Sequence, residues 1–255
     1  MCAERKLSVA VAVTGASGAL YAVRTLAALL SRGVHVELVV SDYGRRLLRD
    51  ELGEKATVER LVPYLTEKYG RDVESGTVSL HSNRDLGATI ASGSHGCSGM
   101  AIVPCSMKTL AGVAHGLSRN LVERAADVML KERRPLIIVP RETPMSLPQL
   151  KNMVLCAEAG AMILPAMPAF YQLPTSLDDL ADFMAGKILS ALGFEHELYP
   201  AWTGRVIGGV TNTVSPQSSQ NSQRDPRNEK KTSTMATKAR STRRRSVARR
   251  PAKPV

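Results

Sequence analysis

The sequence predicts an α/β fold, a three-layer α/β/α sandwich in which helices cover both faces of a mostly parallel sheet. The apolar runs are short and rich in valine. They lack the polar alternation of half-exposed strands, which is typical of strands buried on both faces. Segments with helical spacing alternate with these runs, an order typical of parallel sheets. Of the residues, 44% are hydrophobic but only 4% are aromatic, so small aliphatic side chains must fill the core.

The first predicted unit consists of a strand, a turn of small residues and a helix. The strand covers 7–13 (LSVAVAV), the turn covers 14–18 (TGASG), and helical spacing continues over 19–31. The unsatisfied N–H groups and the dipole at such a helix start favour a phosphate. The turn lacks the G-x-G-x-x-G pattern, however, so a tight turn that binds nothing remains an alternative.

The rest of the body continues this alternation without an internal repeat. The expected strands cover 34–40, 77–80, 99–103, 136–139 and 161–164, and the expected helices begin near Tyr43, Val58, Thr109, Asn120, Leu147 and Ser176. Together these elements predict one domain with a Rossmann-like, mostly parallel sheet.

The loops that follow the strands should meet at the carboxyl edge of the sheet, where open α/β sheets bind ligands. Residues 15–17, Ser41 and residues 106–109 should converge there, and Arg141 and Glu142 should arrive at the same edge. Ser106 and Thr109 either cap a helix or hold a phosphate. This set predicts a site for a nucleotide or a flavin, with Arg141 as its counter-charge, and leaves the chemistry open.

The net charge of +11 belongs to the C-terminal segment. From Arg205 onward there are 13 Lys and Arg but only 2 Asp and Glu, so residues 1–204 carry 21 charges of each sign. We therefore predict a ligand-binding domain over 1–205 and a disordered, Ser/Arg-rich basic tail over 206–255. The polybasic stretch 240–250 could contact nucleic acid or anionic lipid, but we interpret it as a solvated extension.

Membrane and metal-binding classes are disfavoured. No run approaches the roughly 20 apolar residues that span a bilayer. The apolar stretch near the N-terminus runs directly into the glycine turn, so we interpret it as a strand and not as a signal peptide, and we expect a cytoplasmic protein. The four cysteines (Cys2, Cys97, Cys105 and Cys156) lack C-x-x-C spacing and the five histidines lack ligand spacing, so no metal site is expected.

Several segments, in order, resemble the flavin prenyltransferases, once described as aromatic acid decarboxylase subunits within a superfamily of homo-oligomeric flavin-containing decarboxylases. They are VTGASGALYAVR, ASGS, PCSMKTLAGVAHG, ERAADVMLKERRPLIIVPRETP and PAFYQLPTSLDD, within about residues 7–202. The resemblance implies a metal-independent enzyme that joins the dimethylallyl group of dimethylallyl monophosphate to N5 and C6 of reduced FMN. It also implies trimers packed into dodecamers, with sites at the trimer interfaces, and a product passed to a prenylated-FMN-dependent decarboxylase.

The resemblance further implies roles for individual residues. The FMN-binding positions are Gly15, Ala16, Ser17, Ser41, Ser106, Met107, Lys108, Thr109 and Arg141. The positions that reach the prenyl phosphate, partly across a subunit boundary, are Lys131, Arg141, Glu142, Tyr171 and Lys187. Ser17, Glu51 and Glu142 match catalytic positions, and the first two of these are associated with protons around flavin N5.

Two positions depart from the family pattern. Lys187 stands where an arginine is common, which keeps the charge but loses the bidentate fork, so the choice of prenyl donor is open. Asp85-Leu86 stands where an aromatic side chain often lies near the flavin. Two alternative functions remain. One is an FMN-dependent cysteine-type decarboxylase, although Tyr21-Ala22-Val23 stands where such relatives have a catalytic histidine; the other is a non-catalytic flavin-binding protein.

Overall fold

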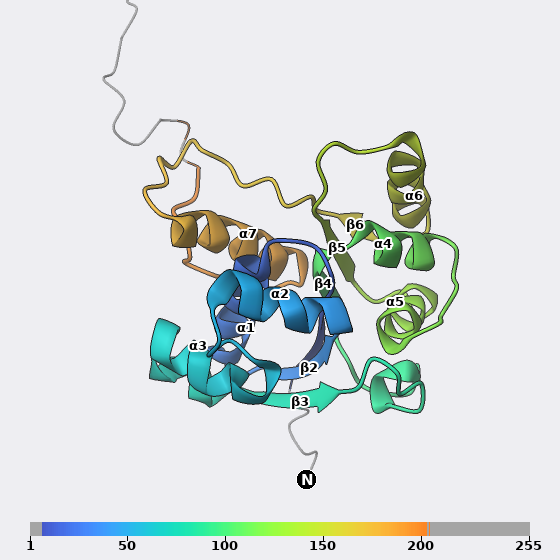
Figure 1. Cartoon of the computed structure of the whole chain (residues 1–255), viewed down its shortest axis with the longest axis horizontal. Helices are drawn as coiled ribbons and strands as arrows, with labels where there is room; N and C mark the ends of the chain where they lie inside the picture. The colour runs from blue at the N-terminus through green and yellow to red at the C-terminus, as the bar shows by residue number, and fades with distance from the viewer. Residues whose placement is uncertain (1–6, 203, 205–255) are drawn as a thin grey trace, which may run out of the picture. The chain divides into compact units, whose positions relative to one another are not determined.

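The computed structural model describes residues 7–202 and 204, and the predicted basic tail lies outside them. Strands and helices alternate along the described chain in the predicted order (Figure 1). The strands are β1 (Ser8–Val13), β2 (His35–Val40), β3 (Thr77–His81), β4 (Met100–Cys105), β5 (Leu136–Pro140) and β6 (Met162–Ile163). All five strand pairings among these residues are parallel, so the predicted α/β fold with a parallel sheet is confirmed.

The strand order creates a crevice at the carboxyl end of β1. The order is β3-β2-β1-β4-β5-β6, so the chain builds outward from β1 first on one side and then on the other. The loops after β1 and β4 therefore leave the sheet in different directions. Such a reversal is where open α/β sheets bind ligands.

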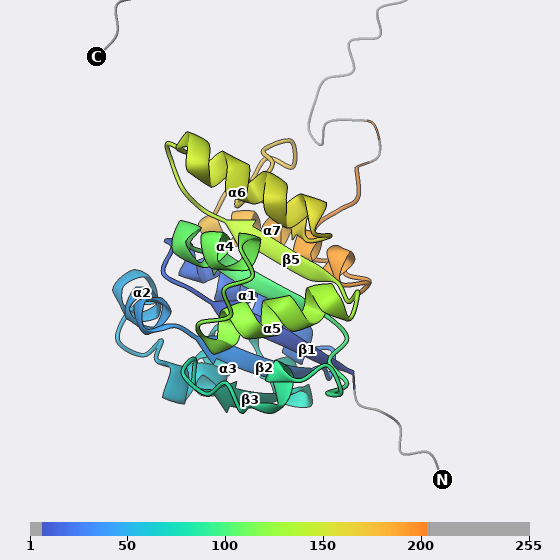
Figure 2. The same cartoon turned by 90° about the vertical axis from the view of Figure 1, so that its right-hand side faces the viewer.

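Helices cover both faces of the sheet (Figures 1 and 2). One face packs against α1 (Ala19–Leu30), α3 (Leu61–Tyr69) and α7 (Leu177–Ala191), with α2 (Asp42–Leu52) beside α1. The other face packs against α4 (Met107–Ala114), α5 (Leu121–Lys131) and α6 (Leu147–Glu158). Three short 3-10 helices, η1 (Val58–Arg60), η2 (Arg71–Ser75) and η3 (Thr89–Ala91), join these elements in the described chain.

Strand β1 lies between two hydrophobic cores, which explains its apolar sequence. All six of its residues are buried. Val9, Val11 and Val13 face the core that contains α1, whereas Ala10 and Ala12 face the core that contains α5. A strand covered on both faces has no solvent-exposed side, so it needs no polar residues.

A buried carboxylate lies on the face of the sheet that α4, α5 and α6 cover. Glu37 in β2 is only 4% exposed, and its oxygens lie 2.6 Å from His81 Nε2 and 2.9 Å from His95 Nε2. Burial alone would raise the pKa of Glu37, but the hydrogen bonds from these two imidazoles outweigh burial and lower it. The carboxylate is therefore ionised at neutral pH and fixes the loop that carries His95 to the sheet.

Candidate active site

The hydroxyl group of Thr14 connects the loops that follow β1 and β4. Thr14 is 1% exposed. Its Oγ1 donates to the carbonyl oxygen of Pro104 at 2.9 Å and accepts from the Ser106 N–H at 2.7 Å. The backbone N–H of Thr14 also donates to Pro104 O at 3.2 Å. Two segments that the sequence predicts at the carboxyl edge are thus brought into contact.

Arg141 connects the loop after β5 to the loop after β1. Its Nε donates to the carbonyl oxygen of Ser17 at 3.1 Å. The neighbouring Glu142 turns to its own loop, where its carboxylate accepts from the Thr143 N–H at 3.0 Å. The predicted convergence of the first loop with Arg141 is therefore observed, and both Arg141 and Glu142 remain partly accessible.

The N-terminus of α1 is occupied by a carboxylate of the protein. Glu51, near the end of α2, accepts from the Gly18 N–H at 3.0 Å and from the Ala19 N–H at 2.8 Å. Gly18 has a φ of 120° and no side chain that could cap the helix, so Glu51 supplies the missing acceptor. A phosphate at this helix start, one of the two sequence interpretations, would have to displace Glu51.

A cavity of about 290 Å³ opens where β1, β2 and β4 end. Five of the predicted flavin-binding residues line it: Gly15, Ser41, Ser106, Lys108 and Thr109. The hydroxyl oxygens of Ser41 and Ser106 also cap α2 and α4, with 3.1 Å to Gly44 N and 3.3 Å to Thr109 N. Three hydroxyl groups, an ammonium group and the amino end of α4 form a donor set that fits a phosphate monoester such as the FMN phosphate.

The absence of a side chain at Gly15 lets the loop after β1 pass close to Tyr43 beside this cavity. A Cβ atom on Gly15 would lie 2.6 Å from Tyr43 Cβ, closer than any real contact. The backbone can therefore pass beside Tyr43 only because residue 15 is a glycine. Ala16, Ser17 and Met107 belong to the predicted FMN segments but do not line the cavity.

Sequence reasoning missed several residues that line the cavity. They are Thr14, Tyr43, Asn83, Asn120, Val122 and Glu123. Asn120 could have been found from the sequence, because asparagine is a preferred helix N-cap residue. Its side chain does cap α5 by accepting from Glu123 N at 3.1 Å. Asn83 lies in an irregular segment and accepts from Val122 N at 3.2 Å, a contact that no local pattern predicts.

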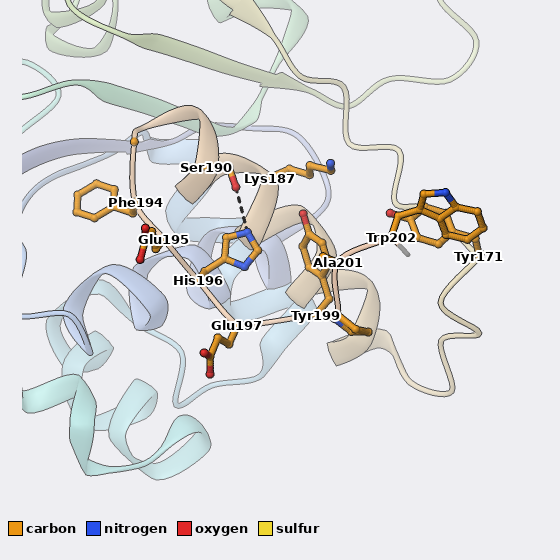
Figure 3. A pocket seen from close by; sticks show the side chains of 12 residues that line it. Tyr171, Lys187, Ser190, Phe194, Glu195, His196, Glu197, Tyr199, Ala201 and Trp202 are labelled. Carbon is orange, nitrogen blue, oxygen red and sulfur yellow. Dashed lines mark hydrogen bonds between the residues drawn. The ribbon is translucent and has the colours of Figure 1, made fainter. Parts of the chain in front are cut away.

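A second, larger pocket of about 1170 Å³ lies between α7 and the segment over 193–202 (Figure 3). Tyr171 and Lys187, both predicted at the prenyl phosphate, line it. The ring of Tyr171 packs edge-on against Trp202, with 5.0 Å between ring centroids, and the ammonium group of Lys187 lies 5.5 Å from the centre of the Phe183 ring. This pocket offers a cation and a phenol beside apolar rings, which suits a phosphate ester with a small hydrocarbon group.

His196 also lines the second pocket, and the sequence did not indicate it. Its Nε2 lies 3.1 Å from Ser190 Oγ. Burial lowers the pKa of His196, and the positive charges of Arg32 and Lys187 lower it further. The imidazole of His196 is therefore neutral at pH 7, and of these two side chains Lys187 supplies the positive charge in the pocket.

Lys131 lies apart from both pockets. Helix α5 starts near the first cavity at the carboxyl edge and ends at Lys131, five residues before β5 begins. Lys131 is thus at the amino edge of the sheet, where it pairs with Glu132. Within one chain the first cavity and the second pocket share no residue, and Lys131 reaches neither.

Three further properties of the described residues concern metal binding, membrane spans and thiols. Among residues 7–202 and 204, no group of three or more His, Cys, Asp or Glu side chains is arranged to hold a metal ion. The same residues contain no helix that is long and apolar enough to cross a membrane. Burial raises the pKa of the Cys105 and Cys156 thiols, so neither is a thiolate at neutral pH.

Known proteins resemble this chain over about three quarters of its length. The family model described as "Flavoprotein" matches residues 2–187. A flavin prenyltransferase UbiX from Halalkalibacterium halodurans is 48% identical over 192 residues, which are 75% of this chain and 91% of that protein. The corresponding protein of Pseudomonas aeruginosa is 41% identical over 76% of this chain and 93% of its own length.

Two solved structures agree with these sequence relatives. AnUbiX (PadA1), determined in complex with FMN and dimethylallyl pyrophosphate, has a TM-score of 0.71 and 36% identity, and covers 79% of this chain and 100% of its own. A dodecameric FMN-dependent UbiX-like decarboxylase from Escherichia coli O157:H7 has a TM-score of 0.69 and 37% identity, and covers 78% and 100%.

Proposed function

This chain belongs to the flavoprotein family and is a flavin prenyltransferase, and we propose that its two pockets together join the dimethylallyl group of dimethylallyl monophosphate to N5 and C6 of reduced FMN. The observation that carries the assignment is the match to flavin prenyltransferases at up to 48% identity, over more than nine tenths of those relatives. The arrangement of the loops agrees with it, because the hydroxyl-lined cavity fits the phosphate end of FMN.

We propose that the first cavity holds FMN. Ser106, Thr109 and Lys108 would bind its phosphate, and Ser41 and Gly15 would line the adjoining part of the ligand. When bound, reduced FMN supplies an electron-rich ring whose face can stabilise an allylic cation. Arg141, already bonded to Ser17 O, would close the far side of the site and present its remaining donors to the ligands.

The leaving phosphate needs the most help from the protein, because a monophosphate is a poor leaving group. Tyr171 and Lys187 would hold it in the second pocket, where the phenol donates a hydrogen bond and the ammonium group offsets the developing charge. Lys187 offers a point charge and no bidentate fork, so phosphate binding should be looser than with arginine. Ser17, Glu51 and Glu142 lie around the carboxyl edge of the sheet, where they would donate and accept protons during the reaction.

We propose that a neighbouring copy completes the site. Lys131 ends α5, which covers the face of the sheet opposite α7, and it lines neither pocket, so it can join Tyr171 and Lys187 in one site only from another subunit. The first cavity, at about 290 Å³, is also at the small end for a ligand of this size. Both points support a homo-oligomer, for which we propose a dodecamer with sites at trimer interfaces. The UbiX-like relative of solved structure is described as dodecameric.

The test of the function is direct. Purified protein is incubated with reduced FMN and dimethylallyl monophosphate without oxygen, and the flavin is analysed by mass spectrometry. We expect a flavin enlarged by one dimethylallyl group. An unmodified flavin, in parallel with an active known family member, would refute the proposal. Dimethylallyl diphosphate in a second reaction reports the donor preference.

The remaining parts of the proposal concern context. We propose that the product passes to a prenylated-FMN-dependent decarboxylase, that the protein acts in the cytoplasm, and that residues 1–205 suffice for catalysis. The basic tail over 206–255 would be a solvated extension. A chain ending at residue 205 should therefore prenylate FMN at the rate of the full chain, and a large loss of rate would assign the tail a role.

A further inference from the structure

The bonds of Thr14 continue the contact between β1 and β4 beyond their regular pairing. The regular pairing between β1 and β4 runs from Ala10–Met100 to Ala12–Ile102. The register of β4 against β5 shifts between Ile102 and Cys105, so β4 is irregular where it passes Thr14. Beyond this point the Thr14 N–H and hydroxyl group both donate to Pro104 O, and the hydroxyl oxygen accepts from Ser106 N. A side chain thus continues the pairing of two strand ends that are 90 residues apart.

The two loops joined in this way both line the first cavity. Thr14 and Gly15 lie on one loop, and Ser106, Lys108 and Thr109 lie on the other. Ser106 is also the N-cap of α4, so the position of its backbone sets where that helix starts. Moving Ser106 N away from Thr14 would therefore move the amino end of α4 and the Lys108 side chain relative to Gly15.

Another buried threonine shows what a purely local role looks like. Thr25 in α1 is 0% exposed, and its hydroxyl group donates to Tyr21 O at 2.8 Å, one turn earlier in the same helix. That bond connects no separate segments. Thr14, in contrast, makes its side-chain bonds to the end of β4 and to the loop after it, and it lines the cavity.

We propose that Thr14 is a positioning residue for the flavin. Its hydroxyl group sets the spacing between the Gly15 loop and the amino end of α4, and this spacing determines how tightly FMN binds. The inference rests on the proposed function, because it takes FMN as the ligand of the first cavity.

The test compares FMN affinity among matched variants of the full chain. Thr14→Val keeps the shape but leaves the Ser106 N–H without its acceptor, so we expect FMN to bind roughly tenfold more weakly. Thr14→Ser keeps the hydroxyl group and should restore most of the affinity. Thr25→Val is the control: it removes a hydroxyl group from an equally buried threonine, and FMN affinity should stay at the wild-type value. Affinity is measured from the quenching of flavin fluorescence, and thermal unfolding is followed in parallel.

The outcomes separate the inference from the function. Equal FMN affinity of Thr14→Val and the wild type would overturn the inference, and so would an equal loss in Thr25→Val. If Thr14→Val does not fold, Thr14→Cys carries the same test, because a thiol fills the space but is a weak donor and acceptor. A wild-type chain that does not bind FMN would instead refute the proposed function, on which the inference depends.

Discussion

The carboxylate of Glu51 should stabilise the start of α1, and Glu51→Ala measures this contribution. The variant leaves the Gly18 and Ala19 N–H groups without the acceptor that they have at 3.0 and 2.8 Å. Loss of an N-terminal cap costs about 0.5–2 kcal/mol. Because Glu51 is exposed and water can replace it, we expect about 1 kcal/mol, which lowers the midpoint of thermal unfolding by about 2–4 °C in a domain of this size. Differential scanning calorimetry measures the shift.

Two further variants show which property of Glu51 matters. Asp50→Ala is the matched control, since Asp50 lies on the same helix and makes an exposed ion pair with Arg46. It should change the free energy of unfolding by less than about 0.5 kcal/mol. Glu51→Gln keeps one acceptor but cannot exchange a proton, so it should stay close to wild-type stability and lose prenylation activity. The capping argument would be wrong if Glu51→Ala unfolded at the same temperature as Asp50→Ala.

Three other predictions concern the donor pocket, the subunit boundary and the buried carboxylate. Lys187→Arg restores a bidentate fork and should lower KM for dimethylallyl monophosphate several-fold with little change in kcat, as steady-state kinetics would show; an unchanged KM would mean that this side chain does not touch the phosphate. Lys131→Ala and Tyr171→Ala should each be nearly inactive, but co-expressed chains should regain part of the activity, because some interfaces then combine an intact Lys131 with an intact Tyr171; no recovery would argue against a shared site. Glu37→Gln should destabilise the fold at pH 7 by about 1–3 kcal/mol. Because the pKa of Glu37 is lowered in the folded chain, its contribution is present above the ordinary value of 4.5 and is lost as the pH falls through the folded pKa. The stability difference between wild type and Glu37→Gln, measured by urea unfolding, should therefore shrink below about pH 4.5, and a constant difference would contradict this.

The sheet was predictable because its signal lies within each strand. The six residues of β1 are all buried, and this is the reason for their unbroken apolar sequence. The bounds of the edge strand β6 were harder to predict. A strand was expected over residues 161–164, but only Met162–Ile163 pair, and Met162 is half exposed. Helix α4 begins at Met107, two residues before the expected start, because Ser106 and not Thr109 is its cap.

The candidate site was predictable where topology alone decides the position. The loops after β1, β2 and β4 must meet at the carboxyl edge of a parallel sheet, and Gly15, Ser41 and Ser106 do line one cavity. Contacts that arise by packing were missed. Glu51 was named through the family resemblance alone, and its bond to Gly18 joins positions 33 apart in the sequence, which no local pattern shows in advance.

The carboxylate at the start of α1 has a consequence for the polarity of whatever ligand enters. A molecule such as FMN is anionic at one end only. The N–H groups at the start of α1 already have a carboxylate acceptor in Glu51, whereas the start of α4 lines the first cavity and carries Lys108. The anionic end of such a ligand is therefore attracted to α4 and not to α1.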